Sequence, residues 1–412
     1  MWSAELQREE LTEKEKRNVE IMEILRRRGP ISKPDIAKEI GINVVTISNY
    51  IGDFIKHKLV QERELDVSEG GRRPVLLDLN PRAGYIIGAG LNLTNMIGVL
   101  VDLKGNIVLK TQLDRREAST REIVDSVLDV IRETIRRSKD YTKDIQGIGI
   151  GIAGIIDKKN GSIRWPEYIS AGRTNYASVN LPLRELVERE FGLLTIIEND
   201  ATAACFGERW LQLEPGLKNL VYMFSGVGVG IMINGQVYNG SRGCAGEPAI
   251  YSYKEEELFN CSLGNPCFLK RWETSLGIVD EVKAALRKDP EAARQFLSLT
   301  SSDIDSLDLK SVFAARRQGD AVAIQALDTA AKRLGIKIAY IVNLLNPETV
   351  IIGGGLEDAG EEFLSKVTQT VREWAFREAA EHLKVVYSQL RENAVALGAA
   401  SLVMQKIFAG LL

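Results

Sequence analysis

A carboxylate stands where an expected strand meets an expected helix. The apolar run Leu194–Ile197 is typical of a strand, and Glu198-Asn199-Asp200 follows it before a helical segment, residues 201–209. Ligands of α/β folds collect at such junctions, beyond the carboxyl ends of the strands. Asp200 could therefore take a proton, or accept a hydrogen bond, from a sugar hydroxyl. The alternative is that Asp200 caps its own helix, which spacing alone favours.

Two glycine-rich segments could bind phosphate. One is Ser225–Gly230, which lies between two expected strands, and the other ends the apolar run Val350–Leu356. Backbone N–H groups of such loops can donate to phosphate oxygens. A lone glycine-rich run is a weak signal, so tight packing is the alternative at both places.

Residues 32–58 have the pattern of a helix-turn-helix. Ser32 can cap a first short helix, Gly41 permits a tight turn, and Asn43 can cap the second helix. Isoleucines that should face inward recur every fourth residue, at Ile47, Ile51 and Ile55. The opposite face carries groups suited to base edges and phosphates of a major groove: Thr46, Ser48, Asn49 and Lys56.

A wing follows this pattern. Leu59–Asp66 and Val75–Leu79 are typical of strands, and the glycine-rich tip between them carries Arg72 and Arg73. From residue 26 to residue 58, seven Lys or Arg side chains outnumber three Asp or Glu. This local excess provides the attraction to phosphate that binding to DNA needs. An amphipathic dimerisation module with solvated basic residues is the alternative, but it leaves the wing unexplained.

The overall composition limits the classes of function. The 412 residues are enough for two or three domains, and the net charge of −3 excludes nucleic-acid binding by overall charge. No signal peptide and no membrane-spanning run is recognised, so we expect a cytoplasmic protein. The four cysteines are too few for a disulfide framework in a chain of this length.

The rest of the chain alternates strands with helices. An expected hairpin at residues 85–102 has a counterpart at residues 220–237, which indicates an internal duplication. In the strand Gly147–Ile152, glycines alternate with isoleucines, so that one face is bare and open to close approach by backbone or ligand. The pattern predicts an α/β fold with mixed sheets.

Several motifs in this order resemble the ROK family of repressors, open reading frames and sugar kinases, in its winged-helix branch of xylose and N-acetylglucosamine repressors. The motifs are Gly-Gly-Arg-Arg-Pro74 with Leu79-Asn80-Pro81, Ile148–Gly154 with Asp157, Glu198–Ala204 with Gly207-Glu208, Asn234-Gly235 with Gly246-Glu247, and Ile352–Gly355. The resemblance implies an actin-like (ribonuclease H-like), duplicated, two-lobed sugar-kinase body behind the winged helix-turn-helix domain.

The same resemblance predicts the domain organisation. The winged helix-turn-helix should occupy residues 1–82, the N-terminal lobe residues 83–200, and the C-terminal lobe residues 201–391. A last helix, about residues 392–408, should pack back on the N-terminal lobe.

One departure from the family pattern concerns phosphoryl transfer. In the family's kinases the first hairpin carries Asp-x-Gly-Gly-Thr, whose aspartate helps to position metal-bound phosphates, and the aligned run here is Gly90-Leu-Asn92-Leu93-Thr94. A charge is lost and side chains are added where phosphate would lie. We therefore expect no enzyme, with Asp200 as a vestigial base. The vestigial nucleotide loops comprise Gly90, Thr94, Ser225, Gly226, Gly228, Gly353 and Gly354.

A second departure concerns zinc, which the family binds through one histidine and three cysteines. Ile250 stands at the position of the histidine, and the chain's only histidines are His57 and His382, far from it in sequence. Two cysteines of the set remain, Cys261 and Cys267. Because tetrahedral zinc needs four ligands, we expect no metal and no cofactor. The alternative is that Cys244 and a carboxylate complete the site.

The sequence thus predicts a DNA-binding transcriptional regulator, a repressor of carbohydrate genes, that binds a palindromic operator as a homodimer or higher oligomer. A small sugar should control it. In the family the histidine that is missing here also contacts the sugar, so the polar groups left to bind a sugar are Asn199, Asp200 and Glu247. The residues predicted to bind DNA are Lys33, Thr46, Ser48, Asn49, Lys56, Arg72 and Arg73. Two alternatives remain, an active ATP-dependent sugar kinase with a fused head and a dimeric DNA-binding protein that needs no ligand.

Overall fold

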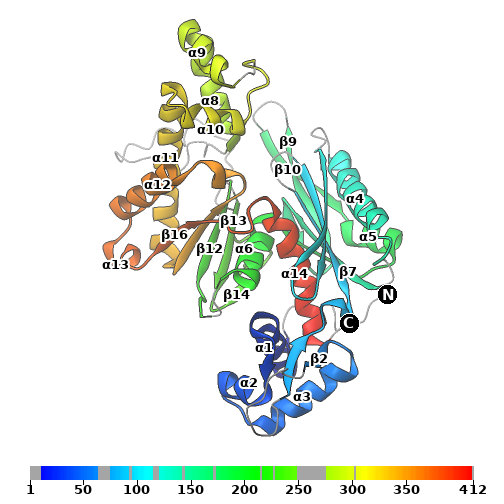
Figure 1. The fold of residues 1–412 in the computed structure, drawn as a ribbon. Coiled ribbons are helices and arrows are strands. Elements are labelled where there is room, and N and C mark those ends of the chain that lie inside the picture. The colour runs from blue at the N-terminus through cyan, green and yellow to red at the C-terminus, as the bar shows by residue number, and fades with distance from the viewer. Residues whose placement is uncertain are drawn as a thin grey trace.

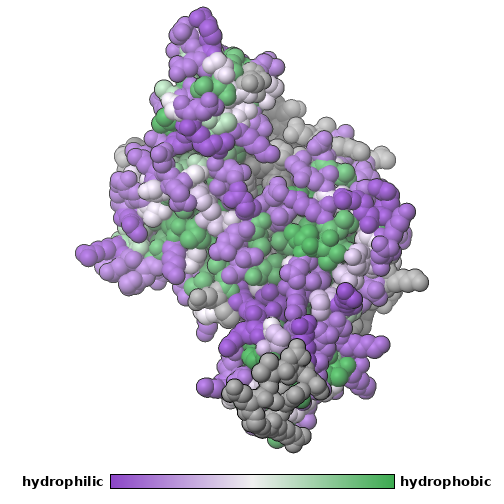
Figure 2. All heavy atoms as spheres, in the orientation of Figure 1, coloured by the Kyte–Doolittle hydropathy of each residue, from purple (hydrophilic) through white to green (hydrophobic). Residues whose placement is uncertain are grey.

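The computed structural model describes residues 11–63, 75–91, 95–114, 120–141, 144–169, 173–213, 216–225, 228–247, 275–300 and 303–410. Figure 1 shows two lobes side by side, with a small N-terminal head beneath them. Most of the surface on the near face is hydrophilic, and hydrophobic side chains gather across the middle of the two lobes (Figure 2).

The head is a winged helix-turn-helix. It contains α1 (Glu13–Arg28), β1 (Ile31–Ser32), α2 (Lys33–Ile40), α3 (Val44–Lys56), β2 (Val60–Arg63) and β3 (Leu76–Leu79), with strand order β1-β3-β2. The caps confirm the predicted turn, because Asp35 N donates to Ser32 Oγ at 3.3 Å and Thr46 N donates to Asn43 Oδ1 at 2.7 Å. Gly41 lies between the two helices with φ of 79°.

Two details of the head differ from the sequence prediction. Ile47 and Ile51 are buried as expected, but the third inward residue of α3 is Phe54, whereas Ile55 is only half-buried. A helix turns once every 3.6 residues, so a strict four-residue spacing drifts away from the core face. The sequence did not predict α1, which packs against the body. The wing's tip, with Arg72 and Arg73, lies outside the described residues.

The N-terminal lobe is built on a five-stranded sheet of order β11-β7-β4-β5-β6. Its strands are β4 (Tyr85–Leu91), β5 (Asn95–Asp102), β6 (Ile107–Asp114), β7 (Ile145–Ile152) and β11 (Thr195–Asn199), and its helices are α4 (Thr120–Arg137) and α5 (Leu183–Phe191). A smaller sheet of order β10-β9-β8 adjoins it, made of β8 (Ile155–Asp157), β9 (Ser162–Ile169) and β10 (Arg173–Leu181).

The C-terminal lobe repeats the main sheet, with order β16-β15-β12-β13-β14. Its strands are β12 (Leu220–Phe224), β13 (Gly228–Ile233), β14 (Gln236–Val237), β15 (Thr349–Gly353) and β16 (Lys384–Tyr387). Its helices are α8 (Ser275–Lys288), α9 (Pro290–Thr300), α10 (Leu309–Arg317), α11 (Ala321–Leu345), α12 (Glu361–Trp374) and α13 (Arg377–Ala380). In both sheets a strand pairs antiparallel with its hairpin partner and parallel with a later strand, which confirms the predicted duplication.

Two helices, α6 (Asp200–Leu211) and α14 (Ala394–Ala409), lie between the sheets (Figure 1). The bare glycine face of the first sheet is covered by α14, since a Cβ atom on Gly88 or Gly149 would lie 2.0 Å from a carbonyl oxygen of α14. The two helices also touch each other, because a Cβ atom on Gly398 would lie 1.8 Å from Ala203 O. The predicted close approach is therefore made by backbone, and α14 and α6 form one packed unit.

Candidate functional site

The junction between β11 and α6 carries Asn199 and Asp200, two of the residues predicted to bind the sugar. The helix cap is Asn199, whose Oδ1 accepts from Thr202 N at 3.2 Å, so the interpretation of Asp200 as the cap was wrong. Asp200 is 7% exposed, and its Oδ1 accepts from Ala201 N at 2.8 Å. The cap is one residue earlier because Asn199 has the extended backbone that a cap needs.

An ion pair that the sequence did not predict lies next to this junction. Lys158 Nζ is 2.7 Å from Glu198 Oε2, and Glu198 is 4% exposed. The other oxygen of Glu198 accepts from Asn199 N at 3.0 Å, and Asn199 Nδ2 donates to Gly154 O at 3.3 Å. The two residues of the pair are 40 positions apart, so no local spacing could have joined them. The pair fixes the backbone that presents Asn199.

Glu247 reaches the same region through β13. Gly246 has a φ of 90°, and a Cβ atom there would lie 1.8 Å from Val229 O, so only glycine fits beside this strand. A Cβ atom on Gly230 would in turn lie 2.2 Å from Ala201 O, next to Asp200. Glu247 is exposed, and desolvation by the surrounding atoms raises the pKa of its carboxyl. Close backbone packing therefore connects the segments that carry Glu247 and Asp200.

The two glycine loops lie side by side and bind each other. Ser225 N donates to Gly353 O at 3.0 Å, and Ser225 Oγ donates to Gly354 O at 2.6 Å. A Cβ atom on Gly353 would lie 1.9 Å from the Tyr222 hydroxyl, and one on Gly354 would lie 2.5 Å from Ser225 Oγ. Packing therefore accounts for Gly353 and Gly354.

The first loop is described only in part. A Cβ atom on Gly228 would lie 3.3 Å from Ala201 Cβ, a tight but possible contact. Gly226 lies outside the described residues, as does Thr94 of the first hairpin. The assignment of these positions to a vestigial nucleotide site stays a prediction.

Gly90 faces α14. A Cβ atom there would lie 2.5 Å from Ala396 N and 2.9 Å from Val395 Cβ. The carboxylate that the kinases of the family carry at this place would collide with the first turn of α14. Glycine at residue 90 therefore leaves room for α14, and a larger side chain there would require the helix to move.

The cysteines do not converge in the part of the chain that the structure describes. Cys205 is fully buried in α6, and burial raises the pKa of its thiol to about 12, so it stays an inert thiol. Cys244 is exposed, while Ile250, Cys261 and Cys267 lie outside the described residues. Among the residues that are described, no three His, Cys, Asp or Glu side chains form a group that could hold a metal ion. The expectation of no zinc stays a prediction.

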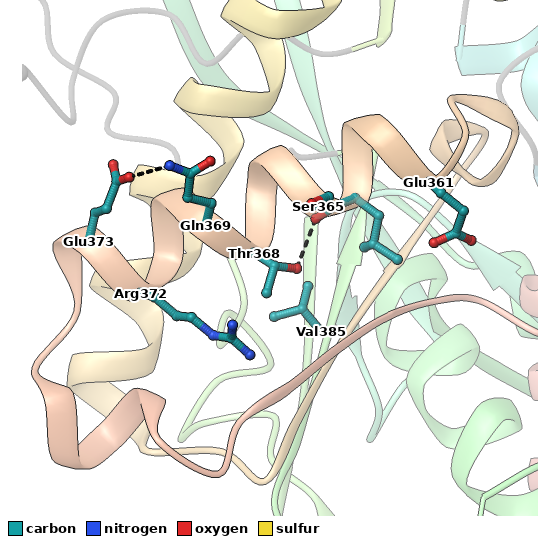
Figure 3. A pocket seen from close by; sticks show the side chains of 8 residues that line it. Glu361, Ser365, Thr368, Gln369, Arg372, Glu373 and Val385 are labelled. Atoms are coloured by element: carbon teal, nitrogen blue, oxygen red, sulfur yellow. Dashed lines mark hydrogen bonds between the residues drawn. The ribbon is translucent and has the colours of Figure 1, made fainter.

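A shallow groove lies along α12 and β16 (Figure 3). Several of its polar groups are already bonded within α12, since Thr368 Oγ1 donates to Leu364 O at 2.8 Å and Gln369 Nε2 donates to Glu373 Oε1 at 2.7 Å. The lining residues are Glu361, Leu364, Ser365, Thr368, Gln369, Arg372, Glu373 and Val385. The groove contains none of the predicted sugar-binding residues.

The head presents its predicted DNA-binding residues to solvent to different extents. Asn49 and Lys56 are exposed, whereas Lys33, Thr46 and Ser48 are half-buried. Ser48 Oγ donates to Val44 O at 2.9 Å. All five lie on α2 or α3 of the described head.

The basic patch is smaller than the sequence count implied. Arg26 and Arg27 were counted toward it, but both are turned to the body, and Arg28 is paired with Glu39 at 2.5 Å. Of the seven basic residues counted, Lys33, Lys38, Lys56 and Lys58 are left for such a patch in the described part of the head.

The last turn of α1 binds the carboxyl end of α6. Arg27 donates to Leu213 O at 2.6 Å, to Arg209 O at 2.9 Å and to Trp210 O at 3.1 Å. Arg26 also donates to Trp210 O, and its guanidinium lies 5.7 Å from the centre of the Trp210 ring. The last carbonyls of a helix lack partners within it and form the negative end of its dipole, so guanidinium groups suit this place.

Further contacts strengthen the junction between head and body. Glu23 of α1 lies 3.1 Å from Arg27 and 3.0 Å from Arg209. Asn18 Nδ2 donates to Ala409 O at 3.0 Å, and Asp78 of the wing is 2.8 Å from Lys104 of the body. One continuous apolar core passes from the head through α14 and α6 into both sheets. The helix that begins at Asp200 therefore ends on the head.

No helix among the described residues is long and apolar enough to cross a membrane.

The duplicated two-lobed α/β body and the winged helix-turn-helix head confirm the predicted fold class. The chain belongs to the ROK family, whose model matches residues 87–406. It is 30% identical to a xylose repressor of Caldicellulosiruptor bescii over 91% of this chain and 92% of that protein. It is 24% identical to the DNA-binding transcriptional dual regulator NagC of Escherichia coli over 93% of this chain and 91% of that protein.

Solved structures agree with the fold. A ROK family transcriptional regulator, described as a homologue of the E. coli MLC protein, superposes with a TM-score of 0.74 at 24% identity and covers 97% of each chain. A ROK family glucokinase from Streptomyces griseus, in complex with glucose and AMPPNP, superposes with a TM-score of 0.65 at 28% identity. That glucokinase corresponds to 77% of this chain, whereas the regulator also covers the head.

Proposed function

We propose that this protein is a transcriptional repressor of carbohydrate genes, which binds DNA through its head and a small sugar between its lobes. The observation that carries the proposal is the match to a xylose repressor along head and body together, over 92% of that repressor. The head supports it independently, because α2, the Gly41 turn and α3 have the geometry of a groove-reading unit.

The body acts as a sensor and not as a kinase. At Gly90 the first turn of α14 occupies the space that a phosphate-site aspartate would need. Ser225, which could have met a nucleotide, donates instead to Gly354 O at 2.6 Å. Positioning of the metal-bound phosphates is most of what phosphoryl transfer requires from a protein. The loss of these groups favours binding without chemistry.

The sugar is bound by Asn199, Asp200 and Glu247. A carboxylate can accept hydrogen bonds from the hydroxyl groups of a sugar, and an amide can both accept and donate them. The Lys158–Glu198 pair at 2.7 Å holds the backbone next to Asn199, so the ligand groups are preorganised.

Sugar binding reaches the head along α6. The helix has 12 residues and is therefore about 18 Å long, with Asp200 at one end and the bonds from Arg26 and Arg27 near the other. A ligand that shifts the first turn of α6 also shifts the surface on which α1 rests. The size of the effect is limited by the sugar's preference for one of the two arrangements.

The repressor works as a homodimer on a palindromic operator. Two heads related by a twofold axis read half-sites about 34 Å or a multiple of this apart. A change in the position of each head relative to its body then changes the fit of the pair to the operator.

A mobility-shift titration tests the proposal. The full-length protein is titrated onto the DNA upstream of its own gene, with D-xylose, N-acetylglucosamine or glucose present. We expect one sugar to weaken the complex. A complex that no sugar of a broad panel alters would contradict the inducer role.

A second assay separates the remaining alternatives. The same preparations, incubated with ATP, should form no phosphorylated sugar, and turnover that Asp200→Asn abolishes would identify a kinase instead. An effector should also raise the midpoint of thermal unfolding, whereas a body that only dimerises gives no response.

A further inference from the structure

The first turn of α3 exposes two valines to solvent. Val45 is 73% exposed, the largest value for any bulky apolar side chain that the structure describes, and Val44 is 42% exposed. Valine is not a favoured residue for an exposed helix position, because its branched side chain loses rotamer freedom there. Neither packing within the head nor helix propensity explains an aliphatic side chain at residue 45.

The buried residues of α3 fix the direction in which Val45 points. Ile47 and Ile51 are 0% exposed and define the core face. Successive residues of a helix are rotated by about 100°, so residue 45 lies about 160° from residue 47 around the axis, nearly opposite the core face. Residues three and four positions apart are neighbours on a helix surface, which puts Val45 beside Ser48 and Asn49. The valine therefore belongs to the face that the sequence predicts to read bases.

Gly52 continues the same face by one further turn. It is exposed, it lies inside a helix, and a Cβ atom there would meet nothing within 4 Å. No intramolecular contact therefore requires a glycine at this position, although glycine is the least favoured residue of a helix interior after proline. Glycine is used where another backbone or a ligand must come close. An external surface that approaches α3 at residue 52 accounts for it.

One partner fits both features. Only base pairs that contain thymine present a methyl group in the major groove, and this methyl group is the usual contact of an apolar side chain there. A helix lying deep in the groove also brings its middle close to the walls, which are formed by the sugar-phosphate backbone. Val45 and Gly52 lie two turns apart on one face of α3, so a single docked duplex can meet both.

We propose that Val45 determines sequence specificity by contacting the methyl group of one thymine in each half-site, and that Gly52 allows α3 to enter the groove deeply enough for this contact. The inference rests on the proposed function as a DNA-binding repressor and adds to it the base that the helix selects. Ser48 and Asn49 then read the polar edges of the neighbouring base pairs.

Deoxyuridine tests the contact, because it differs from thymidine only by the missing methyl group. A tight-binding duplex is first selected from a random library with the full-length protein, and each thymine is then replaced singly by uracil. At one position per half-site we expect uracil to weaken binding about fourfold, the equivalent of one buried methyl group.

Val45→Ala, which removes two methyl groups, should bind the parent duplex less tightly by a factor of about four or more and should no longer distinguish thymine from uracil at that position. Val44→Ala, one residue away and rotated by about 100°, is the matched control and should keep the discrimination. Equal losses from uracil in the wild type and in Val45→Ala at every position would overturn the inference while leaving DNA binding intact. Failure to select any preferred duplex would instead overturn the proposed function.

Gly52→Ala gives a second and independent readout. Since the site is exposed and helical, alanine should raise the midpoint of thermal unfolding. The same variant should bind the selected duplex at least tenfold less tightly, because the added methyl group holds α3 away from the groove wall. A variant that is more stable and binds as tightly as the wild type would show that nothing approaches Gly52, and would overturn this part of the inference.

Discussion

Breaking the contact between α1 and α6 should disconnect the head from the sugar site. Replacing Arg27 with methionine keeps most of the apolar side chain but removes its donors to Leu213 O, Arg209 O and Trp210 O. Hydrogen bonds from a charged donor contribute about 1.5–3 kcal/mol each. The Arg27 side chain is 16% exposed, so water can replace some of the lost hydrogen bonds. We expect the substitution to weaken the binding of the head to the body by about 3 kcal/mol. Coupling free energies between two binding sites are typically about 1–3 kcal/mol. A loss of this size is therefore large enough to abolish the coupling between the sugar site and the head.

The assay is fluorescence anisotropy of a labelled selected duplex, titrated with protein in the presence and absence of the effective sugar. The wild type should show two different dissociation constants, and Arg27→Met should show a ratio close to one while still binding DNA. Arg28→Met is the control, because Arg28 is 61% exposed and pairs with Glu39 inside the head. The control should change the affinity slightly and leave the ratio intact. An unaltered sugar response in Arg27→Met would refute the role of α6 as the connection.

Three further predictions follow from individual residues. Asp200→Asn should keep DNA binding and reduce sugar affinity at least tenfold, about 1.4 kcal/mol, measured by calorimetry. Gly90→Asp should restore no kinase activity and should lower the free energy of unfolding by about 1–3 kcal/mol in urea, because its Cβ atom would lie 2.5 Å from Ala396 N. Lys337 is 3% exposed, and burial lowers its pKa to about 7 from 10.5. The unfolded chain therefore binds more protons between these values, and stability should rise with pH from about 7 to 10.5 by at most about 1.4 kcal/mol per unit. In Lys337→Met this increase of stability with pH should be absent. Urea unfolding at pH 7 and pH 9 measures it, and an equal change of the free energy of unfolding in the wild type and the variant would contradict the prediction.

Local patterns were sufficient to predict the parts of the fold that local physics determines. The caps at Ser32 and Asn43 and the turn at Gly41 depend on side chains within three residues of the groups they satisfy, and the structure confirms them. The burial of Phe54 in place of the predicted Ile55 is also a local effect, and the helical period of 3.6 residues would have predicted it.

Contacts between distant segments could not be predicted in this way. The alternating glycines of β7 indicated a bare face, but nothing in residues 147–152 identifies the element that covers it, and only the resemblance to the family predicted that the last helix packs on this lobe. Arg26 and Arg27 looked like part of a DNA-binding patch, because basic side chains near a helix-turn-helix usually are. Their acceptors lie more than 180 residues later in the chain, and only the folded structure joins them.

The candidate site shows the same division. The position of Asn199 and Asp200 at a strand-to-helix junction followed from a general rule of α/β folds. The neighbouring pair Lys158–Glu198 did not, since Lys158 lies in the turn after β8 and Glu198 lies 40 residues later in β11. Val45 was overlooked because a valine in a helix is first assigned to the core, and its 73% exposure became visible only in the structure.

One sugar and one operator should bind the same protein at separate sites and oppose each other. Calorimetric titration of the effective sugar into the free protein, and then into the protein saturated with its selected duplex, tests this directly. Thermodynamic linkage requires the sugar's dissociation constant to increase by the same factor by which the sugar weakens DNA binding. We expect that increase to be at least fivefold, the lower end of typical couplings. Identical sugar affinities in the two titrations would contradict the account.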